Sequence, residues 1–405
     1  RHLVTVEHDG ITSELEVDFA PGAGGIKVRL NTAPTTDLSP IITQPLSQRT
    51  EPGGTARFSV QAGDPAATYQ WYHDGIPVGD GSAVLEITEA SDAHAGTYWV
   101  DVTDSLGTTS SRQTVLAVKP PPYDTDRLVN ISTRGQVLTE AKIMIAGFVL
   151  AGPEPKEVLV RAVGPTLSEF GLNGTLADPA IELVRLTPGG ELLVGSNNAW
   201  ETGQDPAAIQ QVSSRVGAFP LNSGTLDAVV HANLEPGAYT AKVTGRDDLT
   251  GVSLVEVYDA DDTSAALPLG QVVNISTRGE VGTDAEVLIA GFVVTGDAPR
   301  QVLIRGVGPG LAAFGVPGTL EDPQITLFKT IPGSGSEEVT WNDDWGNAPE
   351  TDALKAATVA TGAFALADGS WDAALLVWLE PGAYTAQVSG ADRGTGVALV
   401  LSLIH

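Results

Sequence analysis

The sequence predicts an all-β protein built from several β-sandwich domains. Its 405 residues include 46 Gly and 26 Pro, a composition typical of a chain with many turns. Between these turns lie short runs of alternating apolar and polar residues, as expected of strands with one buried face. No apolar run approaches the ~18 residues of a membrane-spanning helix. The length allows about two to four domains, each large enough to have its own core.

Charge and cysteine content narrow the classes of function. Lys and Arg number 22 against 50 Asp and Glu, which gives a net charge of −28. Nucleic acid and anionic lipid are therefore not expected partners, because both bind basic surfaces. Two interpretations of the acidity stay open: a solvated surface that favours solubility, or carboxylates bridged by divalent cations. The chain has no Cys, which excludes disulfides, thiolate metal sites and Cys nucleophiles. It begins at Arg1 rather than Met, which fits a removed leader or a fragment of a longer protein.

Residues 1–38 form an N-terminal segment and linker. Strands are predicted at Leu3–Val6, Ser13–Phe19 and Gly25–Leu30, and Thr32–Pro40 reads as an extended linker. Three such strands can barely stand alone, so their apolar residues require a partner. One interpretation is a remnant of an upstream domain, and the other is donation of a strand to a second subunit. The residues expected to form this assembly strand are Leu3, Val4, Val6, Leu15, Val17 and Phe19.

Residues 39–119 carry the most recognisable pattern. A strand at Gly54–Ala62 is followed by Tyr69–Tyr72 and then by Asp92–Val102. This segment resembles an immunoglobulin domain of the intermediate set. Trp71 stands at the family's core Trp, and Tyr98 stands at its tyrosine corner.

The two positions of the family's disulfide are occupied by Val60 and Val100. The resemblance implies a sandwich whose core contains these two Val residues together with Trp71 and Tyr98. Such Cys-free modules are similar to those of large bacterial surface proteins, where they act as spacers or adhesion modules. The fold alone decides no function.

Residues 120–262 and 263–405 are two copies of one domain. Leu128–Gly135 (LVNISTRG) recurs as Val272–Gly279 (VVNISTRG), and Leu234–Ala241 (LEPGAYTA) recurs unchanged at Leu379–Ala386. This period is far longer than that of solenoid repeats, so it indicates a tandem duplication.

Each copy is expected to be a β-sandwich or jelly-roll-like domain with one short helix. Strands are predicted in the first copy at Leu128–Ser132, Ile143–Val149, Val158–Val163, Ile181–Leu186, Leu192–Val194, Asp227–Ala232, Tyr239–Thr244 and Val252–Tyr258. Asp205-Pro206 predicts a helix start, and the helix of the second copy is expected from Thr351 to Val359. The closing hairpin resembles bacterial pre-peptidase C-terminal domains, which implies a repeat of a long secreted bacterial protein.

No catalytic constellation is found. None of the six His residues has a metal-binding spacing, Gly-x-Ser-x-Gly is absent, and no phosphate-binding Lys follows the Gly-Pro turns at Gly164 and Gly308. The sequence therefore predicts a protein that is not an enzyme and that has no cofactor.

Several residues carry weaker signals. Asp259–Asp262 and Asn342–Trp345 offer oxygens to Ca²⁺, although solvated turns are the alternative. Trp200 and Trp345 are interpreted as core residues, with sugar stacking as the alternative. Arg134 and Arg278 are expected to pair with acids. Formal N-glycosylation sequons occur at Asn130, Asn173 and Asn274, and a hydrogen-bonding role is favoured for the first and the last.

The predicted function is a structural subunit of an extracellular bacterial filament, sheath or surface fibre. Copies of the chain are expected to assemble head-to-tail, with the N-terminal strands of one added to the second repeat of the next. The alternative is an adhesin or carbohydrate-binding accessory module that binds cell-surface polysaccharide.

Overall fold

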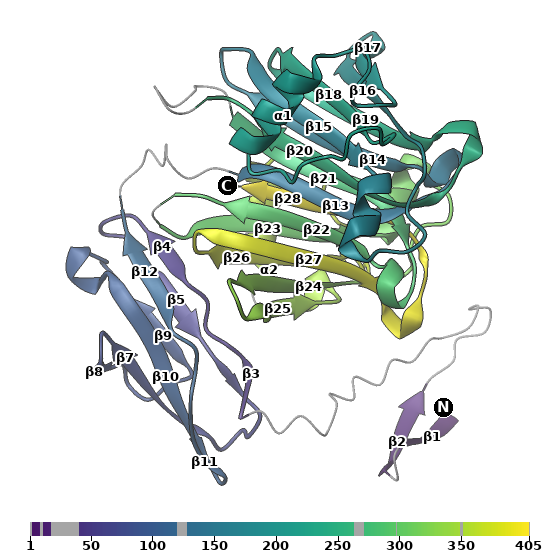
Figure 1. The fold of residues 1–405 in the computed structure, drawn as a ribbon. Coiled ribbons are helices and arrows are strands. Elements are labelled where there is room, and N and C mark those ends of the chain that lie inside the picture. Colours follow the sequence, from purple (N-terminus) through teal and green to yellow (C-terminus); the bar gives the residue numbers. More distant parts are fainter. Residues whose placement is uncertain are drawn as a thin grey trace. The chain divides into compact units, whose positions relative to one another are not determined.

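The computed structural model describes residues 2–8, 11–17, 40–119, 128–262, 271–296, 298–348 and 351–404 (Figure 1). The chain divides into two compact units, residues 1–39 and 40–405, and each is described by itself. In the described ranges, no helix is both long and apolar enough to cross a membrane. The mostly β fold predicted from the sequence is confirmed.

The N-terminal unit contains a hairpin of β1 (His2–His8) and β2 (Ile11–Val17). The antiparallel register pairs Val4 with Leu15 and Leu3 with Glu16. The expected third strand at Gly25–Leu30, and Phe19, lie outside the described residues.

Residues 40–119 form the immunoglobulin-like sandwich. Its strands are β3 (Ile41–Thr43), β4 (Gln48–Thr50), β5 (Ala56–Ser59), β6 (Gln61–Ala62), β7 (Thr68–His73), β8 (Ile76–Val78), β9 (Val84–Ile87), β10 (Gly96–Asp104), β11 (Gly107–Ser110) and β12 (Thr114–Val118). One sheet has the order β4-β12-β10-β7-β8, with β11 on β10, while β5 pairs with β9 and β3 with β6. A short 3₁₀ helix, η1 (Asp92–His94), leads into β10.

The core of this domain is built around Trp71, which is fully buried. Val60, Tyr98 and Val100 are buried in the same cluster, and Val100 lies opposite Trp71 in the β7–β10 register. The Tyr98 hydroxyl donates a 2.8 Å hydrogen bond to the carbonyl of His94, four residues upstream. This is the geometry of a tyrosine corner. Two Val side chains therefore occupy apolar space where related domains have a disulfide.

The two repeats have the same strands and α-helix in the same order, and the second has one additional 3₁₀ helix, η7, before its α-helix. The first comprises β13 (Leu128–Val137), η2 (Glu140–Lys142), β14 (Met144–Ala151), β15 (Lys156–Val163), η3 (Pro165–Phe170), β16 (Pro179–Thr187), β17 (Gly190–Asn197), α1 (Pro206–Arg215), β18 (Ala228–Leu234), β19 (Gly237–Gly245), η4 (Arg246–Asp248) and β20 (Gly251–Asp259). The second comprises β21 (Gln271–Val281), η5 (Asp284–Glu286), β22 (Leu288–Val294), β23 (Arg300–Val307), η6 (Pro309–Phe314), β24 (Pro323–Ile331), β25 (Gly335–Asn342), η7 (Trp345–Asn347), α2 (Thr351–Ala360), β26 (Ala373–Leu379), β27 (Gly382–Gly390), η8 (Ala391–Arg393) and β28 (Gly396–Ile404). The eight strands and the helix predicted for the first copy are all present.

The repeats exchange their first strands. β13 pairs with β20 of its own repeat on one side and with β22 of the second repeat on the other. β21 pairs in the same way with β28 of its own repeat and with β14 of the first. Near the middle of β13 and β21, the buried hydroxyls of Thr133 and Thr277 lie 2.8 Å apart. This hydrogen bond therefore joins equivalent positions of the two repeats.

The exchange creates two eight-stranded sheets, which a single bridge between Gln136 of β13 and Glu280 of β21 joins into one 16-stranded system. The pairings give one sheet the order β18-β15-β20-β13-β22-β27-β24-β25. The other has the order β26-β23-β28-β21-β14-β19-β16-β17. Their inner faces share a single hydrophobic cluster that contains residues of both repeats. The boundary expected between residues 262 and 263 therefore does not divide the core.

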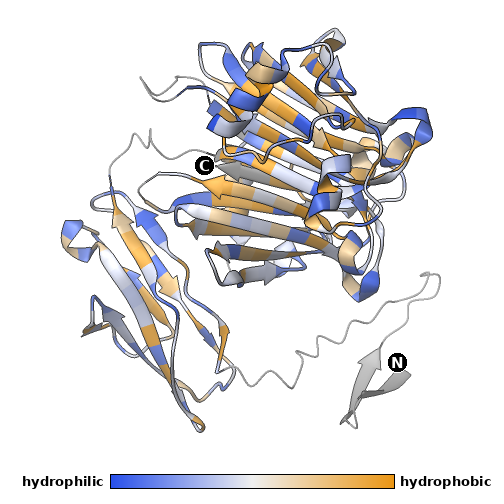
Figure 2. Ribbon diagram, in the orientation of Figure 1, coloured by the Kyte–Doolittle hydropathy of each residue, from blue (hydrophilic) through white to orange (hydrophobic). Residues whose placement is uncertain are grey.

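The alternation of apolar and polar residues along these strands can be followed in Figure 2. Their outer faces are partly covered by the helices. The Asp205 carboxylate accepts a 3.0 Å bond from the amide of Ala207 and so caps α1, as its sequence predicts. Trp200 and α1 pack on one sheet, and Trp345 and α2 pack on the other. Both Trp residues are buried, so they are core residues and not sugar platforms.

Candidate functional site

The repeated NISTRG motif presents two different faces. Ile131 is buried, and the preceding and following residues, Asn130 and Ser132, point to the outer face. Gly135 faces the packed inner side of the sheet, where an added Cβ would lie 2.8 Å from Leu288 Cδ1. The motif therefore supplies core packing on one face and an Asn-Ser-Arg row on the other. The second copy presents the same row as Asn274, Ser276 and Arg278.

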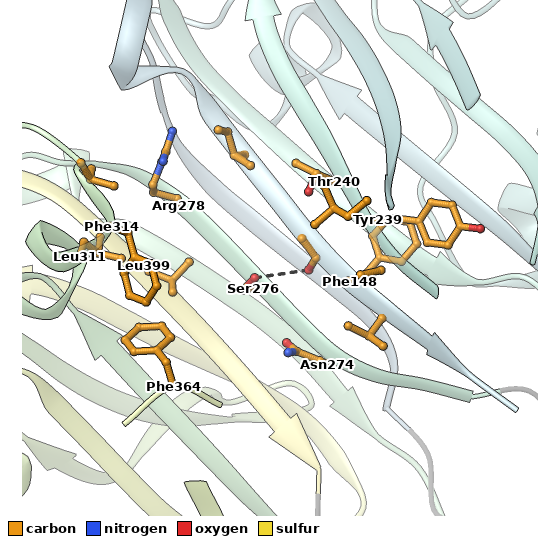
Figure 3. A pocket seen from close by; sticks show the side chains of 16 residues that line it. Phe148, Tyr239, Thr240, Asn274, Ser276, Arg278, Leu311, Phe314, Phe364 and Leu399 are labelled. Atoms are coloured by element: carbon orange, nitrogen blue, oxygen red, sulfur yellow. Dashed lines mark hydrogen bonds between the residues drawn. The ribbon is translucent and has the colours of Figure 1, made fainter. Parts of the chain in front are cut away.

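A groove lies over this second row, on the outer face of the sheet (Figure 3). Its volume is about 340 Å³. It is lined by strands of both repeats, β14 and β19 from the first and β21 and β28 from the second. Figure 3 shows Asn274 and Ser276 between the side chains of Phe314 and Phe364 and those of Tyr239 and Thr240. The ring centroids of the two Phe residues are 4.9 Å apart at an interplanar angle of 65°.

The polar groups of the groove are not fully satisfied. Nε of Arg278 and Oδ1 of Asn274 are buried and have no hydrogen-bond partner. Burial lowers the pKa of the Arg278 guanidinium. Figure 3 marks one hydrogen bond among the residues drawn, a long one of 3.5 Å that Ser276 Oγ donates to the Gly147 carbonyl. Gly147 also leaves the floor open, because a Cβ there would lie 3.0 Å from Ser276 Oγ.

The expectation that Arg134 and Arg278 pair with acids is wrong for the described residues, where neither forms an ion pair. The buried ion pairs of the repeats involve other basic residues, Arg161 and Lys156. Nε of Arg161, which is fully buried, lies 2.9 Å from a carboxylate oxygen of Glu256. Glu256 also accepts hydrogen bonds from the hydroxyls of Ser132 (3.1 Å) and Tyr258 (2.7 Å).

A Lys occupies the place that the sequence offered to calcium at Asp259–Asp262. The buried Nζ of Lys156 lies 2.8 Å from Asp259 Oδ1 and 2.5 Å from Asp261 Oδ2. Burial raises the pKa of Asp259 although Lys156 is beside it. The ammonium balances charge at this turn. In the described part of the chain, no group of His, Asp or Glu residues is arranged to hold a metal ion.

The second repeat lacks the acid that Arg161 uses. Arg305 lies opposite Leu401 in the β23–β28 register, as Arg161 lies opposite Glu256 in β15–β20. All three guanidinium nitrogens of Arg305 are buried without a hydrogen-bond partner. Its carbon Cζ lies 4.5 Å from the ring centroid of Phe364. Burial lowers the pKa of Arg305 to about 10, and Asp372 only partly opposes this.

The sheet edges differ between the repeats. The edge strand β25 is covered by Arg112 of the immunoglobulin-like domain, which donates to the carbonyls of Glu338 (2.9 Å) and Val339 (2.8 Å). Arg112 also forms a 3.0 Å ion pair with Glu337. The edge strands β18 and β26 are each capped by a side chain, because Asn197 Oδ1 accepts the amide proton of Val229 and Asn342 Oδ1 accepts that of Ala374.

The remaining edge, β17, is open. In the described part of the chain it pairs with β16 alone, and no side chain from outside this hairpin hydrogen-bonds to its backbone. Leu192, Leu193 and Val194 are 54%, 58% and 37% exposed. Their register equivalents in β25 include the acids Glu337 and Glu338. An apolar, unpaired edge strand is a template for another strand.

Other polar clusters serve the fold. Asp227 and Asp372 are fully buried below the Gly-Pro turns, where they accept the amide protons of Gly164 (2.8 Å) and Gly308 (2.9 Å). This explains why both copies keep these turns without a phosphate-binding role. Of the sequon residues, Asn130 and Asn274 are half-buried within paired strands, whereas Asn173 is exposed in a turn.

Comparison with known proteins identifies only the N-terminal sandwich. The family model "Immunoglobulin domain" matches residues 39–103. No curated protein matches the chain. Among solved structures, titin M4 is 28% identical over 20% of this chain and 93% of its own, with a TM-score of 0.18.

Two structures of Dlar are also similar. Its tandem Ig repeats are 24% identical over 20% of this chain and 46% of theirs, with a TM-score of 0.18. The N-terminal Ig1-2 module of the Drosophila receptor protein tyrosine phosphatase DLAR is 14% identical over 53% of this chain and 94% of its own, with a TM-score of 0.19. TM-scores this low carry no argument about the rest of the chain, so only the presence of an immunoglobulin-like domain is taken from the comparisons.

Proposed function

We propose that the protein is a structural subunit of an extracellular bacterial filament, sheath or surface fibre. Copies assemble head-to-tail when the N-terminal hairpin of one adds to the edge of a sheet in the next. The observation that carries this proposal is the open β17 edge with exposed Leu192, Leu193 and Val194. An added strand would satisfy its backbone groups and cover these side chains.

The difference between the edge strands β17 and β25 indicates which repeat accepts the added strand. The sequence favoured the second repeat as acceptor, but Arg112 already covers the carbonyls of Glu338 and Val339 there. The same position of the first repeat has Leu193 and no cover. The acceptor in this proposal is therefore repeat one.

The donor is the hairpin of β1 and β2, which forms a unit separate from the rest of the chain. Its register pairs Val4 with Leu15. Because donor and acceptor are different surfaces, their contact is heterologous and extends into an open filament unless a rotation closes it.

The exchanged strands favour a role in which the protein resists mechanical force. The two repeats share one core and are paired through both β13 and β21. Separating them would break both ladders at once. This supplies stability without disulfides in a chain that has no Cys. The high acidity and the resemblance of the closing hairpin to secreted bacterial repeats agree with an extracellular location, and the protein is proposed not to be an enzyme.

The test compares assembly of the full chain with that of two variants. Deletion of residues 1–30 removes the donor, and Leu193→Lys places a charge on the acceptor edge. Both are expected to abolish polymers in electron micrographs and to leave monomers in light scattering. Val359→Lys is the matched control, because Val359 is 81% exposed on α2, away from the edge. Polymers of normal length in either test variant would refute the mechanism.

A further inference from the structure

We infer that the groove over β14 and β21 binds a carboxylated saccharide chain. The polar row of β21 would contact the acid and hydroxyl groups, and the Phe314–Phe364 pair would contact the sugar face. This inference is independent of the assembly mechanism, because the groove lies on the face of a sheet and not at its edge.

The first argument is charge. Arg278 lines the groove and forms no ion pair with any described residue, in a chain whose net charge is −28. Its Nε has no hydrogen-bond partner. A guanidinium in this state gains most from a ligand carboxylate, since charge-assisted hydrogen bonds are stronger than neutral ones.

The second argument is the arrangement of the remaining groups. Alternate residues of a strand lie about 7 Å apart on one face, so Asn274, Ser276 and Arg278 form a straight row. Asn274 lines the groove, and its side-chain amide offers hydrogen-bonding groups that complement ligand hydroxyls. Phe314 is 62% exposed and presents an apolar ring beside this row. A saccharide has both the hydroxyls and the apolar C–H faces that these groups complement.

The third argument separates a saccharide from a peptide. The floor strands use their backbone groups in ladders: β14 pairs with β19 and β21, and β21 pairs with β14 and β28. An extended peptide could not add to them as a strand, and it would lose the main-chain hydrogen bonds that give such complexes their affinity. Recognition here must come from side chains, which favours a ligand rich in hydroxyls.

The first repeat provides an internal control. It has the same row, Asn130, Ser132 and Arg134, and the same aromatic pair, Phe170 and Phe219, with centroids 5.1 Å apart at 66°. There, however, Ser132 donates to Glu256, whose carboxylate would repel an acidic ligand. The second repeat has Leu401 in that register position. The duplicated site thus differs in the one group that decides its charge.

The test is calorimetric titration of the full chain with oligogalacturonate. The methyl-esterified oligosaccharide is the matched neutral ligand, and oligoglutamate is the acidic peptide. We expect oligogalacturonate to bind, and the esterified chain to bind about tenfold more weakly or worse. Arg278→Gln should weaken binding of oligogalacturonate about tenfold or more, and Phe314→Ala should also weaken it.

The matched variants Arg134→Gln and Phe170→Ala should leave the Kd within about twofold. Phe170 and Phe314 are both 62% exposed, so neither truncation removes core packing. The inference is overturned if oligogalacturonate does not bind, if Arg134→Gln weakens it as much as Arg278→Gln, or if oligoglutamate binds more tightly than the saccharide.

Discussion

Replacing Glu256 by Leu tests whether the buried ion pair of repeat one stabilises the fold. The Glu256 carboxylate forms an ion pair with Arg161, whose Nε lies 2.9 Å away, and accepts hydrogen bonds from Ser132 Oγ at 3.1 Å and the Tyr258 hydroxyl at 2.7 Å. Glu256→Leu would leave a fully buried guanidinium without its carboxylate and a buried phenol without its acceptor. Breaking a buried pair from one side costs about 3–5 kcal/mol in the free energy of unfolding. That is a large share of the ~5–15 kcal/mol that stabilises a typical domain.

The second repeat supplies the reverse experiment. Arg305 lies opposite Leu401, and burial lowers its pKa to about 10, which means that the environment disfavours its charged form. Leu401→Glu would place a carboxylate at the position that Glu256 occupies in repeat one. We expect it to cost much less than Glu256→Leu, or to stabilise, because the new charge meets one that is already buried.

Both variants are measured by urea unfolding at neutral pH, followed by the fluorescence of the buried Trp residues and by circular dichroism. The expected order of stability is wild type or Leu401→Glu first, with Glu256→Leu well below. A loss below about 1 kcal/mol for Glu256→Leu would contradict the reasoning. So would an equal loss in the two variants, because it would show that the protein responds to any change at this register position.

Four further predictions follow from other contacts. Trp71→Ala should cost about 3–5 kcal/mol and unfold the immunoglobulin-like domain first, as followed by urea denaturation; a loss under ~1 kcal/mol would contradict its place in the core. Thr277→Val should cost about 1–3 kcal/mol because it leaves the buried Thr133 hydroxyl without its 2.8 Å partner, and a neutral result would remove this bond from the account. Arg112→Ala should speed the hydrogen exchange of β25 amides and leave that of β17 amides unchanged, since only β25 loses the side chain that covers it. If the amides of β25 and β17 exchange at the same rate in the wild-type chain, Arg112 does not protect β25. Burial acts to raise the pKa of Glu380, but hydrogen bonds from Lys329 and Ser47 outweigh it, so the pKa is lowered. The stabilisation from this carboxylate is therefore complete at neutral pH and is lost as the pH falls below about 4.5; Glu380→Gln should flatten the stability profile in that window, and an unchanged profile would exclude the effect.

Local elements could be predicted because their signals are local. The Asp205-Pro206 start gave α1 correctly, and period-two alternation located each strand of the first repeat. The exchange of first strands could not be predicted in this way. LVNISTRG and VVNISTRG are nearly the same sequence, so either strand fits beside β22 or β14, and only the tertiary packing decides.

The polar sites were harder to predict for a related reason. Arg134 and Arg278 stood out because both copies share them, yet the buried pairs involve Arg161 and Lys156, which lie in apolar strands. A cation within the runs KEVLVRAV and RQVLIRGV was the available signal, because a charge on a fully buried strand requires a partner. The partner itself comes from strand register. Glu256 and Leu401 are visible as a difference between copies only once β20 and β28 are aligned.

Disulfide trapping between two differently tagged chains tests the assembly mechanism most directly. The chain has no Cys, so introduced pairs have no competitor. One chain carries Val4→Cys in the hairpin, and the other carries Cys at Leu192, Leu193 or Val194 in β17. A disulfide forms only when the two Cα atoms come within about 7 Å. We predict mixed disulfides at one or more of these β17 positions and none with Glu338→Cys, the equivalent position in the covered strand β25. Trapping at Glu338→Cys with the same yield, or no mixed disulfide at any β17 position, would contradict the mechanism.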